Sequence, residues 1–178
     1  MSDRLNSPAA EMKHVSDNPD NISGTGGDNK AAGNIIQILA SLPDFLRKPM
    51  IQGRLKEFFS MTDENKRETI AMALAAAPTV EPSKLAVLFK TWLEVISDFE
   101  PEKRSVLFSV YSRQVLAAPA SLQKLDFESL TRTYMSLDEK QRQAISDSLH
   151  ESLFALPNPQ DLLKLIPEQA RSALRLKS

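Results

Sequence analysis

Cysteine is absent from the chain, and histidine is scarce. Without a thiol the protein forms no disulfide and offers neither a thiolate metal ligand nor a cysteine nucleophile. Of the two histidines, His14 and His150, neither has a second imidazole nearby in the sequence with which to share a metal ion. The acidic pair Glu100 and Glu102 stands at a predicted helix start, where the helix dipole accounts for it. We therefore expect no enzyme active site, no metal and no cofactor.

Long apolar runs and an excess of one charge are also missing. No apolar stretch reaches the roughly 18 residues of a membrane-spanning helix, so no membrane span is predicted. The first residues lack the basic and apolar regions of a secretory signal, which predicts a cytoplasmic location. Lys and Arg number 22 against 23 Asp and Glu, for a net charge of −1. This balance argues against a protein built mainly to bind nucleic acid or an anionic membrane.

Residues 1–34 differ in composition from the rest of the chain. They contain no aromatic residue and four of the five glycines, with many Ser, Asn and Asp residues. Such a segment cannot bury enough apolar area to offset the backbone entropy of folding, about 1–2 kcal/mol per residue. We predict a disordered tail at 1–34 and a single all-helical domain at 35–178.

From residue 35 onward the sequence is rich in helix formers. Gly53 is the only glycine there, no segment alternates cleanly with a period of two, and prolines punctuate the chain. We predict that Thr62 and Asp98 cap helices, and that Ser136 and Glu139 form a capping box. The predicted helices are 35–41, 44–48, 50–60, 63–77, 82–97, 100–117, 120–135, 137–155, 160–165 and 167–176.

The chain repeats itself with a period of about forty residues. A Lys-Leu pair recurs at Lys84, Lys124 and Lys164, and a proline break recurs at similar intervals. Such a period is typical of stacked helical hairpins and is similar to that of HEAT-like repeats. We predict about three stacked antiparallel hairpins, and the alternative is a compact multi-helix bundle. The predicted hairpin units are 50–81, 82–119 and 120–157, with short capping helices at 35–48 and 158–176.

Three arginines follow the same period. Arg67, Arg104 and Arg142 each lie four residues after an acidic residue. In a regular stack they would form a ladder that could grip acidic groups or phosphates. The competing interpretation, which we favour, is that each arginine pairs with its own acid and adds only about 0.2–0.5 kcal/mol of helix stability.

The lysine series has no such local explanation. Lys84, Lys124 and Lys164 are predicted near helix starts, where a cation opposes the helix dipole. They mark either a ligand-facing edge or, as we favour, positions where lysine stems cover apolar surface. Trp92 is predicted to pack in the core with Phe89 and Ile96.

The N-terminal end of the predicted domain is unusually apolar. A run that begins at Ile35 precedes an amphipathic stretch with Met50, Ile51 and Leu55. Core packing is the favoured interpretation of these residues, and a surface for a partner helix or a second copy is the alternative.

Taken together, the sequence predicts a non-enzymatic helical-repeat module that binds a protein or peptide partner. Two alternatives remain open. One is an adaptor that binds nucleic acid through the arginine or lysine series. The other is a protein with a small-molecule pocket between its helices. The sequence does not indicate the oligomeric state.

Overall fold

The computed structural model describes residues 34–176, and this part of the chain consists of helices without any strand. The predicted all-α class is thereby confirmed for the described residues. The predicted tail lies outside them except for Asn34, which is helical. The elements in chain order are a helix at 34–41, α2 (Asp44–Ser60), α3 (Asp63–Ala76), η1 (Ala77–Thr79), α4 (Pro82–Ser97), α5 (Pro101–Ala117), η2 (Pro119–Lys124), α6 (Phe127–Met135), α7 (Glu139–Phe154), α8 (Pro159–Leu165) and α9 (Glu168–Ala173).

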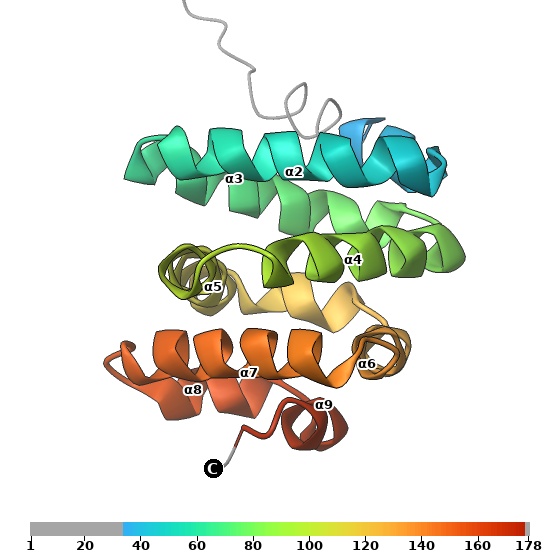
Figure 1. Cartoon of the computed structure of the whole chain (residues 1–178). Helices are drawn as coiled ribbons and strands as arrows, with labels where there is room; N and C mark the ends of the chain where they lie inside the picture. The colour runs from blue at the N-terminus through green and yellow to red at the C-terminus, as the bar shows by residue number, and fades with distance from the viewer. Residues whose placement is uncertain (1–33, 177–178) are drawn as a thin grey trace, which may run out of the picture.

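Figure 1 shows the helices stacked from α2 and α3 at one end to α8 and α9 at the other, and the contacts between them define two rows. In one row α2 packs against α4, α4 against α6, and α6 against α9. In the other row α3 packs against α5, α5 against α7, and both α5 and α7 contact α8. Most of these contacts therefore join helices that are not consecutive in the chain.

One apolar core runs the length of the stack, from Ile51 in α2 to Leu176 after α9. Its most enclosed large side chains are Ile96 in α4 and Leu107 in α5, which are 0% and 1% exposed. The apolar positions of these helices recur every three or four residues, so one face of each helix is buried. Trp92 packs against this core, as predicted, with its ring 5.7 Å from that of Tyr111 and 6.3 Å from that of Phe108.

Pro49 does not break the chain into two helices, and the predicted boundary there is wrong. The residue lies inside α2, which continues from Asp44 to Ser60. A proline inside a helix removes the hydrogen bond to the carbonyl four residues earlier. That carbonyl belongs to Phe45, and both Phe45 and Pro49 are exposed residues, so the missing bond lies on the exposed side of α2.

The predicted helix at 120–135 is also wrong, because it consists of two elements. The 3₁₀ helix η2 ends at Lys124, and α6 begins at Phe127. Asp126 caps α6 by accepting a hydrogen bond from the Ser129 amide at 3.0 Å. An aspartate side chain competes with the backbone for amide hydrogens, and it therefore starts a new helix here.

Two of the three predicted caps need correction. Thr62 caps α3 as predicted and accepts from the Asn65 amide at 3.3 Å. Asp98 instead follows the end of α4, and the α5 cap position belongs to Glu100, whose side chain makes no capping bond. The capping box of α7 pairs Asp138 with Gln141 and not Ser136 with Glu139. The Ser136 hydroxyl donates to the Thr133 carbonyl, so Ser136 belongs to the C-terminal end of α6 and not to the start of α7.

The corrected capping box predicts a difference between two neighbouring substitutions. Asp138→Ala is expected to lower the free energy of unfolding by about 1 kcal/mol, because the Gln141 amide loses its acceptor. Ser136→Ala is expected to change it by less than about 0.5 kcal/mol. Urea denaturation followed by circular dichroism measures both values. A larger loss for Ser136→Ala than for Asp138→Ala would contradict the assignment of the cap.

Candidate binding surfaces

The arginine series has a structural role that follows from its distance to the helix cap. Arg104 and Arg142 each lie four residues after a cap residue, Glu100 and Asp138 respectively. Arg47 has the same spacing from the cap residue of α2. At this position a long side chain can fold back over the turn that precedes its own helix.

Arg104 is 8% exposed and joins three elements. Its guanidinium donates to the carbonyl of Ser97 at 3.2 Å and to the carbonyl of Phe99, at the end of α4 and in the turn that follows. Its Nε donates to the Ser148 hydroxyl of α7 at 2.9 Å. Carbonyls at a helix end have no partner within the helix, so Arg104 satisfies groups that would otherwise be buried without one.

Arg47 repeats this arrangement in the other row of helices. It donates to the carbonyl of Leu39 at 3.1 Å and to that of Leu42, before α2 begins. It also donates to the Thr91 hydroxyl of α4 at 3.2 Å. Thr91 lies 44 residues after Arg47, and Ser148 lies 44 residues after Arg104. Each arginine therefore ties its helix to the next helix of the same row.

The predicted pairing of each arginine with the acid four residues earlier is wrong. Glu100 pairs with Lys103 at 3.1 Å, and Arg104 donates to backbone carbonyls instead of to Glu100. Arg142 donates to the carbonyls of Met135 and Leu137 at 2.9 and 2.8 Å, and its acidic partner is Glu139. Hydrogen bonds from Arg142 are the main reason that the pKa of Glu139 lies below its usual value.

Arg67 does not belong to this set. The cap of α3 is Thr62, so the residue four positions later is Lys66, and Arg67 is one residue out of register. Lys66 pairs with Asp63 at 3.6 Å, while Arg67 is exposed. Within residues 34–176 no acidic side chain pairs with Arg67. Counting from the cap instead of from the acid would have identified Arg47 and excluded Arg67.

The lysine series occupies three different kinds of position. Lys84 lies in the first turn of α4, Lys124 is the last residue of η2, and Lys164 lies in the last turn of α8. All three are exposed, and Lys164 pairs with Asp161 at 3.2 Å. The structure therefore places only Lys84 at a helix start. Ligand binding by the lysines stays a prediction.

A groove of about 410 Å³ crosses three helices of one row, α3, α5 and α7. Val106 and Val110 of α5 give it an apolar floor, and Val106 is 44% exposed. Arg67 of α3 and Arg113 of α5 line it as well. Neither guanidinium has an acidic partner in the part of the chain that the structure describes. Glu151 of α7 also lines the groove and accepts a hydrogen bond from the Ser105 hydroxyl.

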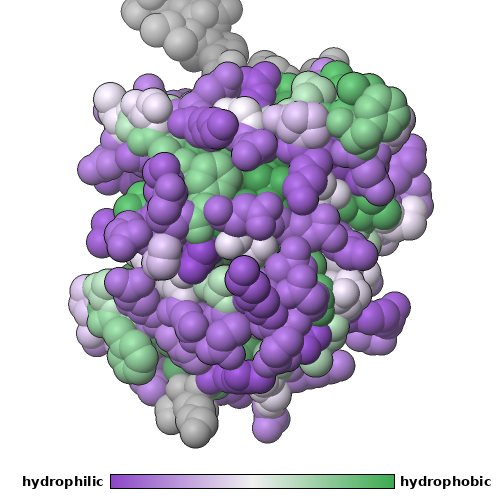
Figure 2. All heavy atoms as spheres, in the orientation of Figure 1, coloured by the Kyte–Doolittle hydropathy of each residue, from purple (hydrophilic) through white to green (hydrophobic). Residues whose placement is uncertain are grey.

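Some apolar side chains at the N-terminal end of the stack are buried in the core, and others are exposed on the surface. Ile51, Leu55 and Phe58 of α2 are buried in the core, as the favoured interpretation predicts. A second set of apolar side chains stays exposed on the helix at 34–41 and the first half of α2. Figure 2 shows hydrophobic surface at this end of the stack, and the exposed residues there are Ile35, Ile38, Phe45, Leu46 and Met50.

No protein-family model, no curated protein and no solved structure matches this chain. Between residues 34 and 176, no three His, Asp or Glu side chains are grouped so as to hold a metal ion. None of the helices in that range has the length and apolar content that crossing a membrane requires.

Proposed function

We propose that this chain is a non-enzymatic helical-repeat module that binds a peptide segment of a partner protein along the α3–α5–α7 groove. The order of helix contacts supports the repeat interpretation, because α3, α5 and α7 follow one another in one row and α2, α4 and α6 in the other. In stacked arrays, each unit adds one helix to a continuous surface, and such surfaces serve as extended binding sites.

The single observation that carries the proposal is the composition of the groove. An exposed valine lines the groove, and arginines without acidic partners stand on two of its three helices. The two carboxylates in its wall, of Asp63 and Glu151, already have partners within the fold. An apolar side chain of a partner fits against Val106 and Val110. Carboxylates of the same partner fit the guanidinium groups of Arg67 and Arg113, because arginine donates two parallel hydrogen bonds to a carboxylate. The proposed ligand is therefore an extended peptide with acidic and apolar residues.

The test is a selection from a displayed library of random peptides, followed by affinity measurements on variants of the full chain. We expect the selected peptides to be rich in Asp and Glu. Val106→Asp is expected to weaken their binding at least about tenfold, because it places a carboxylate on the apolar floor of the groove. Val87→Asp is the matched control, since Val87 is 45% exposed and lies on α4 outside the groove.

The contribution of the groove arginines to peptide binding is tested by separate variants with their own control. Arg67→Ala and Arg113→Ala are each expected to weaken binding and to reduce its dependence on salt. Arg132→Ala removes an exposed arginine of α6 that already pairs with Glu128, so it should leave affinity unchanged. If Val106→Asp and Val87→Asp bind the selected peptides equally well, the groove is not the binding surface and the proposal fails.

A further inference from the structure

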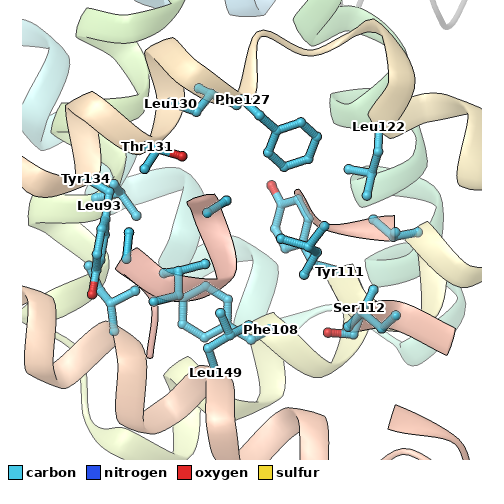
Figure 3. Close-up of a pocket in the computed structure, with 17 residues that line it drawn as sticks. Leu93, Phe108, Tyr111, Ser112, Leu122, Phe127, Leu130, Thr131, Tyr134 and Leu149 are labelled. Carbon is cyan, nitrogen blue, oxygen red and sulfur yellow. The ribbon is translucent and has the colours of Figure 1, made fainter. Parts of the chain in front are cut away.

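A second hollow lies inside the stack, away from the α3–α5–α7 groove. It is an apolar pocket of about 210 Å³ between the two rows, lined by side chains of α4 to α9 and of η2. Figure 3 shows Phe108, Tyr111, Phe127 and Leu149 among the side chains around it. The pocket is larger than an engineered apolar cavity of about 150 Å³ that takes up benzene.

The Tyr111 hydroxyl in the wall of this pocket is a hydrogen-bond donor that the fold does not use. No group within residues 34–176 bonds to this phenol. Figure 3 shows its oxygen at the end of the ring that lies toward Phe127 and Thr131. A phenol in this position can donate a hydrogen bond to an acceptor that enters the pocket.

Tyr134 provides the contrast within the same wall. Its phenol donates to the backbone carbonyl of Arg142 at 3.0 Å, so its polar atom is satisfied by the fold itself. The Tyr111 phenol has no such partner in the described part of the chain, and the ring of Tyr111 lies 5.7 Å from that of Trp92. The fold therefore uses one tyrosine hydroxyl for its own structure and leaves the other facing the pocket.

The chemistry of the wall defines the class of ligand. Burial raises the pKa of Tyr111 to about 12, so the phenol keeps its proton at neutral pH and acts as a hydrogen-bond donor. No charged side chain lines the pocket, so an ionic ligand would lose its hydration without gaining a partner of opposite charge. A neutral molecule with an apolar body and one hydrogen-bond acceptor meets both conditions.

We propose that this pocket binds a small neutral ligand, such as an aromatic ketone, whose carbonyl oxygen accepts a hydrogen bond from Tyr111. The apolar body of the ligand packs against Phe108, Phe127 and Leu149. This site is independent of the peptide groove, which shares no residue with it.

Two probes of nearly the same shape test the hydrogen bond directly. Acetophenone carries a carbonyl oxygen, and α-methylstyrene has a methylene group in its place. The chain contains one tryptophan, so a nitrogen–proton correlation spectrum shows a single indole signal, from Trp92. Trp92 contacts both Phe108 and Tyr111 of the pocket wall, and its indole signal should therefore shift as either probe binds.

Tyr111→Phe removes only the hydroxyl and is the decisive variant. We expect it to weaken acetophenone binding about fivefold and to leave α-methylstyrene binding unchanged, because one net hydrogen bond is lost. Tyr134→Phe is the control, and it should leave both affinities unchanged. Tyr111→Phe should not lower the melting temperature, whereas Tyr134→Phe should lower it, because only Tyr134 has a partner in the fold.

A third variant tests the location of the site. Ala173→Leu adds a larger side chain to the pocket wall from α9 and is expected to abolish the binding of both probes. The proposal is overturned if neither probe shifts the Trp92 signal. It is also overturned if acetophenone binds the wild-type protein and Tyr111→Phe with equal affinity, or if Ala173→Leu folds and still binds both probes.

Discussion

Arg104→Ala is expected to lower the free energy of unfolding by about 3 kcal/mol or more. The substitution removes a buried guanidinium that donates to Ser97, Phe99 and Ser148. Two carbonyls and one hydroxyl then lose their partner in a site that water reaches poorly, at a cost of about 1–3 kcal/mol for each unsatisfied group. Urea denaturation of the full chain measures the loss.

Two further variants separate the role of Arg104 from that of any arginine. Arg113→Ala, on the exposed side of the same helix, should change stability by less than about 0.5 kcal/mol. Arg104→Lys should lower the free energy of unfolding by an amount between those of Arg104→Ala and Arg113→Ala. A single ammonium group cannot reproduce the planar set of donors of a guanidinium. If Arg104→Ala and Arg113→Ala cost the same, Arg104 is not a structural link between α4, α5 and α7.

Ile96→Ala is expected to cost about 2–5 kcal/mol, because it leaves a cavity at the most enclosed position of the core. Ile96 lies in the last turn of α4, and α4 packs against α2, α6 and α7, so its neighbours cannot all move in to fill the space. Val87→Ala on the same helix is the control and should cost less than about 1 kcal/mol, since Val87 is 45% exposed. Equal losses for the two variants, measured by the same denaturation, would contradict the assigned orientation of α4.

The helical class and the buried faces can be predicted from the sequence because they depend on local patterns. The spacing of Leu107, Tyr111 and Val115 identifies the inner face of α5 without any tertiary information. The error at Pro49 has a tertiary cause. A proline disfavours helix locally, but burial of Ile51, Leu55 and Phe58 along the same helix favours its continuation.

The role of the arginines could not be predicted, because it depends on which residue caps each helix. The acid–arginine spacing groups Arg67 with Arg104 and Arg142, whereas the cap of α3 at Thr62 separates it from them. The bonds from Arg47 to Thr91 and from Arg104 to Ser148 span 44 residues, so they depend on the packing of helices and not on local sequence. The peptide groove combines residues from three helices, which no local pattern brings together.

Chemical-shift mapping with a selected acidic peptide tests the proposed function most directly. We predict that the shifts of backbone amides and valine methyl groups concentrate at Arg67, Val106 and Arg113, on two of the three helices that line the groove. Shifts that concentrate instead at Ile35 and Phe45, at the exposed apolar end of the stack, would place the binding surface elsewhere and contradict the proposal.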